Sequence, residues 1–184
     1  MWDTLQRTGR PSANAGLMPD RGTGTDRGTG TARRTRVAAA VVASVLTADG
    51  LLHLFWATGG TWPAHDDRGL SLAVLGMDVP FTAPNLIPLA TVLFCGAGAV
   101  VARARLGRGH RFGRLTQLAT LAVTCGVSAR AAAGVVWACG SGIGLDAHPG
   151  STFHLLNIAV YTPLCAGLAV AAGTVLRGED PIRV

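Results

Sequence analysis

The chain has 184 residues, of which 49% are apolar and only 14% carry a charged side chain. An ordinary soluble domain carries about 25% charged residues, so the composition argues against that class and favours a membrane protein. The formal net charge is +6, and all sixteen basic residues are arginines. A nucleic-acid-binding protein would gather them on one folded surface. Here they are spread over two tails and a central loop, so we expect no nucleic acid partner.

The first 36 residues are rich in Arg, Gly and Thr and contain the hexapeptide DRGTGT twice in succession, at 20–25 and 26–31. Polar, glycine-rich sequence of this kind buries too little apolar surface to offset the conformational entropy of the chain. We therefore predict that residues 1–36 form a disordered cytoplasmic tail.

Four apolar segments follow, each about as long as a helix that crosses a hydrocarbon core roughly 30 Å thick. They comprise residues 37–58, 86–103, 115–138 and 153–176. Amphipathic helices of a soluble protein would show polar residues every three or four positions, whereas the runs 79–102 and 147–176 contain no Asp, Glu, Lys or Arg. The sequence predicts an all-α fold, an integral membrane four-helix bundle over residues 37–176 in contact with the lipid bilayer. A short cytoplasmic tail, 177–184, follows it.

The arginines also predict an orientation. Fourteen of the sixteen lie in the N-terminal tail, in the loop between the second and third segments or near the C-terminus, whereas the other two loops contain only Arg68. Loops rich in Arg stay on the cytoplasmic side of a membrane. We therefore expect a multi-pass protein of the cytoplasmic membrane with both termini inside and the loops 59–85 and 139–152 outside.

Ionisable side chains within the predicted spans form a second pattern, because charge is costly inside a bilayer and needs polar surroundings. The first span carries Asp49 and His53, which are four residues apart and share one helix face. The third carries Arg130, and the fourth adds Asn157 and Tyr161. Counted from the span ends, all five reach similar depths. We predict that they form an intramembrane polar cluster in the outer half of the bundle.

Within this cluster we expect Arg130 to pair with Asp49 across the bundle, with the other three side chains completing the hydrogen bonds. Two interpretations remain open. The ion pair either fixes which helices are neighbours, although a buried pair is weak evidence for stability, or belongs to a polar pocket that binds a small ligand or passes protons.

We expect no cofactor and no metal. The four cysteines lack the C-x-x-C spacing of a thiol oxidoreductase and suit packing between helices. His53 and His154 reach the same level on different helices, but no motif supports a haem between them. The loop clusters 65–67 and 146–148 lack the fixed spacing of a metal site.

Three short motifs resemble one family. HLFWATGGTW (53–62) ends the first span, GIGL (142–145) follows the third span with its Arg130, and NIAVYTPLC (157–165) lies in the fourth. Together they resemble the family called domain of unknown function 3995, small bacterial membrane proteins with four spans. The family pattern combines His-x-x-Trp-x-x-Gly-Gly, an arginine in the third span and Tyr-x-Pro-Leu-Cys.

The resemblance covers about residues 37–176 and implies the topology and the polar cluster, but no activity. The residues that match the pattern are His53, Trp56, Gly59, Gly60, Arg130, Tyr161, Pro163, Leu164 and Cys165. Asp49 is not part of this pattern, so its pairing with Arg130 rests on depth alone.

Three functional hypotheses follow. The first is a non-enzymatic interaction or assembly element that forms a homo-oligomer or joins another membrane protein. The second is a dimeric carrier or proton-coupled permease for a small ligand. The third is a membrane enzyme acting on a lipid or quinone, for which we can place no nucleophile, base or metal motif and therefore expect no catalytic residue.

Overall fold

The computed structural model describes residues 24–106, 109–140, 145 and 148–178, and all regular structure among them is helical. The elements are α1 (Gly24–Ala57), α2 (Asp67–Leu75), α3 (Ala83–Leu106), α4 (Gly113–Ala138), α5 (Thr152–Leu156), the π-helical turn η1 (Asn157–Tyr161) and α6 (Thr162–Arg177). Four stretches are long and apolar enough to cross a membrane: Gly30–Ala57, Ala83–Leu106, Gly113–Ala138 and Thr152–Arg177. The predicted all-α fold with four spans is confirmed.

The first helix begins earlier than the sequence predicts. α1 starts at Gly24, so residues 24–36 are helical and do not belong to a disordered tail. Extending an existing helix needs no new nucleation, and the alanine and arginines just before Val37 are good helix formers. Thr35 also lies beside Gly178 at the end of α6. The predicted tail residues 1–23 and 179–184 lie outside the described residues.

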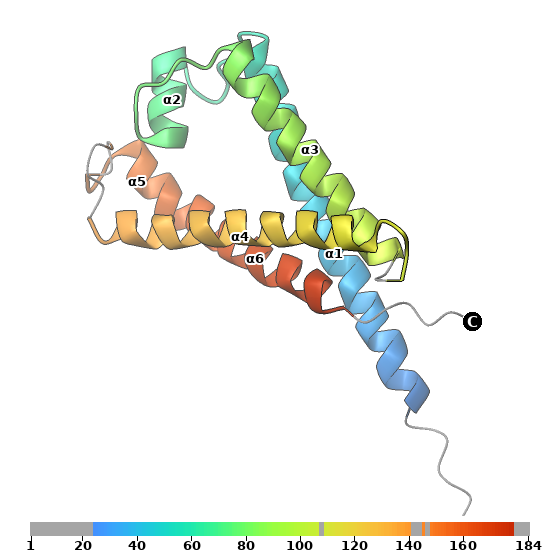
Figure 1. Cartoon of the computed structure of the whole chain (residues 1–184). Coiled ribbons are helices and arrows are strands. Elements are labelled where there is room, and N and C mark those ends of the chain that lie inside the picture. Colours follow the sequence, from blue (N-terminus) through green and yellow to red (C-terminus); the bar gives the residue numbers. More distant parts are fainter. Residues whose placement is uncertain (1–23, 107–108, 141–144, 146–147, 179–184) are drawn as a thin grey trace, which may run out of the picture.

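The four spans form two pairs, α1 with α3 and α4 with α6. Figure 1 shows that the pairs approach each other at one end, where α3 ends and α4 begins, and diverge toward the other, where α2 and α5 lie. We call these the termini end and the α2 end. Contacts between α1 and α6 and between α3 and α4 join the pairs. The bundle is therefore closed at its termini end and splayed at its α2 end.

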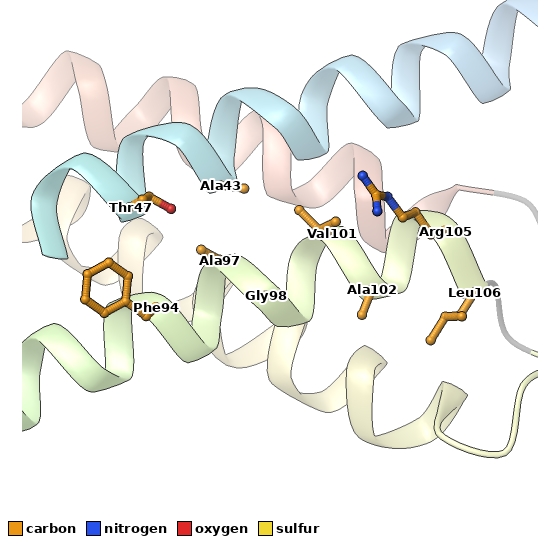
Figure 2. Close-up of a pocket in the computed structure, with 9 residues that line it drawn as sticks. All are labelled: Ala43, Thr47, Phe94, Ala97, Gly98, Val101, Ala102, Arg105 and Leu106. Carbon is orange, nitrogen blue, oxygen red and sulfur yellow. The ribbon is translucent and has the colours of Figure 1, made fainter. Parts of the chain in front are cut away.

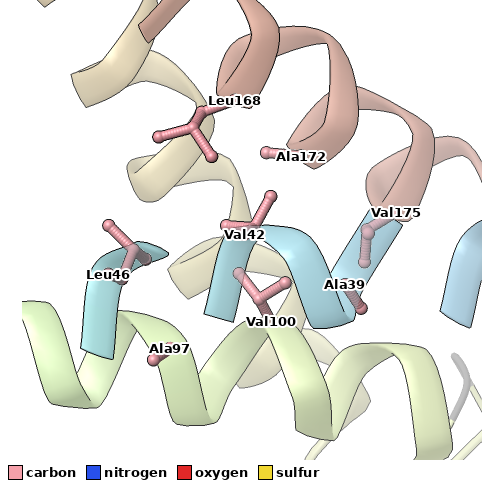
Figure 3. Packing of buried hydrophobic residues seen from close by; sticks show 8 residues of the cluster. All are labelled: Ala39, Val42, Leu46, Ala97, Val100, Leu168, Ala172 and Val175. Carbon is pink, nitrogen blue, oxygen red and sulfur yellow. The ribbon is translucent and has the colours of Figure 1, made fainter. Parts of the chain in front are cut away.

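Side chains of three helices form the apolar core, which lies toward the termini end (Figure 3). It consists of Ala39, Val42, Leu46, Ala97, Val100, Leu168, Ala172 and Val175. Lipid tails are as apolar as this core, so close packing rather than the hydrophobic effect holds membrane helices together. The three alanines let the backbones approach. The α1–α3 pair also has an open groove between its two helices (Figure 2).

The α2 end has its own small core. It also contains α2, which lies within the predicted loop 59–85. Trp56, Leu70 and Leu86 pack together there. Asp66 caps α2 by accepting a hydrogen bond from the Gly69 N–H at 2.6 Å. Such a cap stabilises a helix start by about 1 kcal/mol. The predicted loop 59–85 is therefore partly a short helix that packs on the α2 end of the bundle.

Candidate functional site

Asp49 and His53 meet on one face of α1, as their spacing predicts. The imidazole Nδ1 lies 2.8 Å from the backbone carbonyl oxygen of Asp49 and 3.4 Å from its carboxylate Oδ1. A carbonyl oxygen can only accept, so Nδ1 is the donor, and the ring orientation is fixed. The His53 side chain is 11% exposed, whereas that of Asp49 is 47% exposed. The carboxylate is therefore only partly covered by the packed helices.

The His-x-x-Trp-x-x-Gly-Gly stretch has a structural explanation. His53 and Trp56 are one turn apart, with their rings edge-on at 5.1 Å between centroids. The buried Trp56 indole donates to the carbonyl oxygen of Trp62 at 2.9 Å, which folds the following loop back onto α1. Gly59 has a φ of +91°, a conformation that favours glycine. At Gly60, a Cβ would collide with the Phe55 ring. Gly59 thus provides the left-handed conformation that ends the helix, and Gly60 leaves room for the Phe55 ring.

Asn157 is the centre of the polar cluster. It is fully buried, and its Nδ2 donates to the carbonyl oxygen of Gly134 at 2.7 Å. Its Oδ1 accepts from the Thr162 hydroxyl and from Arg130 Nη1, each at 3.2 Å. Gly134 makes room for this contact, because a Cβ there would collide with the Thr162 hydroxyl. The cluster thereby joins α4 to the fourth span.

Arg130 lies between two aromatic rings. Its guanidinium carbon is 4.9 Å from the centroid of Trp137, two turns along α4, and 5.6 Å from that of Tyr161. Cation–π contacts of this kind contribute about 0.5–2 kcal/mol each. The charge is therefore stabilised by one neutral amide and two ring faces.

A π-helical turn places Asn157 and Tyr161. It spans Asn157–Tyr161 and closes with a hydrogen bond from the Thr162 N–H to the Asn157 carbonyl oxygen. Pro163 follows directly, has no N–H to give to Ala159, and its ring crowds that carbonyl. The structure accommodates Pro163 through this wide turn. The Tyr161 hydroxyl reaches α2, donating to the carbonyl oxygen of Ala73 at a long 3.4 Å.

The expected ion pair between Asp49 and Arg130 is not formed. In the part of the chain that the structure describes, Asp49 pairs with His53 and Arg130 has no carboxylate partner. Both residues nevertheless lie inside the spans, Asp49 on α1 and Arg130 on α4. They do not meet because each bonds locally, and because the helix pairs carrying them diverge.

The remaining motif residues are less engaged. Pro163 and Leu164 are exposed and Cys165 is half-buried with a free thiol. Among the described residues, no three His, Cys, Asp or Glu side chains gather into a metal-binding group. Residues 142–144 and Asp146, which belong to the GIGL motif and to one loop cluster, lie outside those residues.

Three members of the site were missed from the sequence. Gly134 and Thr162 were not predicted as site residues because neither is ionisable. Gly134 nevertheless lies four residues after Arg130 on the same helix face. Trp137 is likewise uncharged, and its ring lies under the Arg130 guanidinium. An arginine followed by glycine and tryptophan at helical spacing was the available signal.

Four apolar spans around a polar cluster define a multi-pass, membrane-embedded protein. A family model described as "Protein of unknown function (DUF3995)" matches residues 46–172, which is more than half of the chain and includes all five polar-cluster residues. The chain belongs to this family, and the resemblance seen in the motifs is confirmed. No curated protein and no solved structure matches the chain.

Proposed function

We propose that the protein is a non-enzymatic assembly element of the cytoplasmic membrane that works as a homo-oligomer, with both termini in the cytoplasm. The supporting observation is that Asp49 and Arg130, two opposite charges inside the spans, do not neutralise each other within one chain. The fourteen arginines on one side support the orientation.

Neither of the two charges has a permanent counter-charge among the described residues of its own chain. Arg130 has an amide oxygen and two rings as neighbours, and His53 balances Asp49 only when the imidazole is protonated. A charge left alone in low dielectric costs several kcal/mol. A second copy related by a two-fold axis can offer Asp49 to Arg130 and Arg130 to Asp49, because such an interface repeats each contact.

The surface next to Arg130 suits such a contact. Gly126 lies one turn before Arg130 on α4, and a Cβ there would meet nothing within 4 Å. Cys125 and Ala129, on either side of that turn, are exposed as well. Small residues at this spacing let a second membrane helix approach closely. The second copy therefore packs along α4 and brings its Asp49 to this face.

Charge reversal in trans tests the proposal. Two differently tagged copies are co-expressed and co-purified, with Asp49→Arg or Arg130→Asp in one or both. Each variant should lose association with itself, because like charges then oppose one another. The mixed pair should recover it, because one interface regains Arg with Asp and the other keeps the native pair. Failure of the wild-type copies to co-purify, or of the mixed pair to recover, contradicts the proposal.

The carrier or permease hypothesis is the second candidate. It is favoured by the same two charges, which lie inside the spans without pairing and would suit a small ligand bearing both signs. Uptake of labelled amino acids into proteoliposomes, with and without a proton gradient, tests it. Flux lost in both Asp49→Asn and Arg130→Gln would favour the carrier over the assembly element.

A further inference from the structure

The open groove between α1 and α3 is apolar along most of its length. It has a volume of ≈ 500 Å³ and is lined by Ala43 and Thr47 of α1 and by residues of α3 from Phe94 to Leu106 (Figure 2). Gly98 forms part of its floor, and a Cβ there would meet nothing within 4 Å. The groove is open to the surroundings of the α1–α3 pair. None of the five polar-cluster residues lines it.

The groove continues into a second hollow toward the termini end. This hollow, of ≈ 350 Å³, shares Val101 and Arg105 with the first and adds Arg36 from α1. Figure 2 shows the Arg105 side chain extending from α3 toward α1. The two hollows therefore adjoin along the helix pair. Together, and called the channel below, they have an apolar body and an arginine from each helix at one end.

The arginine end lies where the membrane meets water. Arg36 directly precedes the apolar run that starts at Val37, and Arg105 is the penultimate residue of α3. Both side chains are exposed, and among the residues that the structure describes neither forms an ion pair. Guanidinium groups match phosphate oxygens in geometry and charge. Basic hollows between spans at the cytoplasmic boundary suit anionic lipid head groups.

We propose that this channel binds one anionic phospholipid, with the phosphate between Arg36 and Arg105 and an acyl chain lying past Val101 and Gly98 toward Phe94. The charge selects the head group, and the apolar body accepts the chain. A zwitterionic lipid makes the same apolar contacts, but its ammonium group offsets the attraction of the phosphate. Because both arginines are at the same end, the site exists in either membrane orientation.

Native mass spectrometry of the detergent-purified full chain tests the site with phosphatidylglycerol and phosphatidylcholine of identical acyl chains. The wild-type protein should bind phosphatidylglycerol more tightly. An arginine at the surface contributes about fivefold in affinity for an anionic lipid, so Arg36→Gln and Arg105→Gln should each lose about that factor. Gly98→Leu should weaken both lipids by filling the groove.

Two matched controls lie away from the channel. Arg114→Gln removes an exposed arginine at the same end of α4, and Gly167→Leu adds a side chain where a Cβ meets nothing within 4 Å. Both should bind lipid as the wild type does. Equal affinity for the two lipids, or an equal loss in Arg114→Gln, overturns the proposal. So does competition by soluble glycerol phosphate, which would make the site one for a free anion. The wild-type comparison stands even if a variant fails to fold.

Discussion

Asn157 in the fourth span donates a hydrogen bond to the carbonyl oxygen of Gly134 in the third, at 2.7 Å and with no exposure of the asparagine side chain. The bond connects the π-helical turn to α4 near the C-terminal end of that helix, and the side-chain carbonyl group of Asn157 accepts a hydrogen bond from Arg130. One side chain thus bridges two spans and, within the described part of the chain, accepts the hydrogen bond that Arg130 donates.

Replacing Asn157 should therefore destabilise the bundle. Asn157→Leu leaves Arg130 and the Thr162 hydroxyl without their shared acceptor, and an unsatisfied buried polar group costs about 1–3 kcal/mol. We expect the midpoint of unfolding in detergent to fall accordingly. Ser128→Ala, which changes an exposed polar residue on α4, is the control and should leave the midpoint in place. Equal midpoints for both variants would show that the hydrogen bonds of Asn157 do not contribute to the stability of the bundle.

Gly134 should tolerate no larger residue. Gly134→Ala places a methyl group against the Thr162 hydroxyl, and overpacking of this kind costs about 1–3 kcal/mol. The second substitution Thr162→Ala removes the colliding oxygen and should restore part of the loss, which a double-mutant cycle measures. Gly167→Ala, at an open position of α6, should not destabilise. Purely additive effects of the two site substitutions would argue against this contact.

Asp49 and Arg130 should behave independently in a monomer. They are not partners within one chain, so the losses of stability in Asp49→Leu and Arg130→Leu should add within about 0.5 kcal/mol in the double variant. The measurement is thermal unfolding of the monomeric fraction separated by size. Recovery of stability in the double variant would instead support the intrachain ion pair that the sequence predicted.

The orientation can be read from two exposed positions, His65 before α2 and Gly109 between α3 and α4. In a variant without the native cysteines, His65→Cys should react with a membrane-impermeant maleimide in intact cells, and Gly109→Cys should react only after lysis. This expectation follows from the positive-inside rule, since the loop between α3 and α4 is rich in arginine. Labelling in the opposite order would invert the topology.

The sequence predicted the four spans because the thickness of the bilayer sets the length of a spanning helix. It also predicted the gathering of Arg130, Asn157 and Tyr161, since depth can be counted along a helix. It failed on Asp49 with Arg130, because depth says nothing about which way two helix faces point. It missed the helical conformation of residues 24–36, where local composition favoured disorder but an adjoining stable helix propagated instead.

The π-helical turn also changes how the fourth span can be aligned. A turn closed over five residues contains one residue more than an α-helical turn, so the segment before it and the segment after it are rotated relative to each other. Phe153 can therefore face α2, near Gly76, while Leu168, Ala172 and Val175 face the core at the opposite end. The fourth span therefore consists of two half-helices, one before and one after the π-helical turn. The first presents its buried face to α2, and the second presents its buried face to the core.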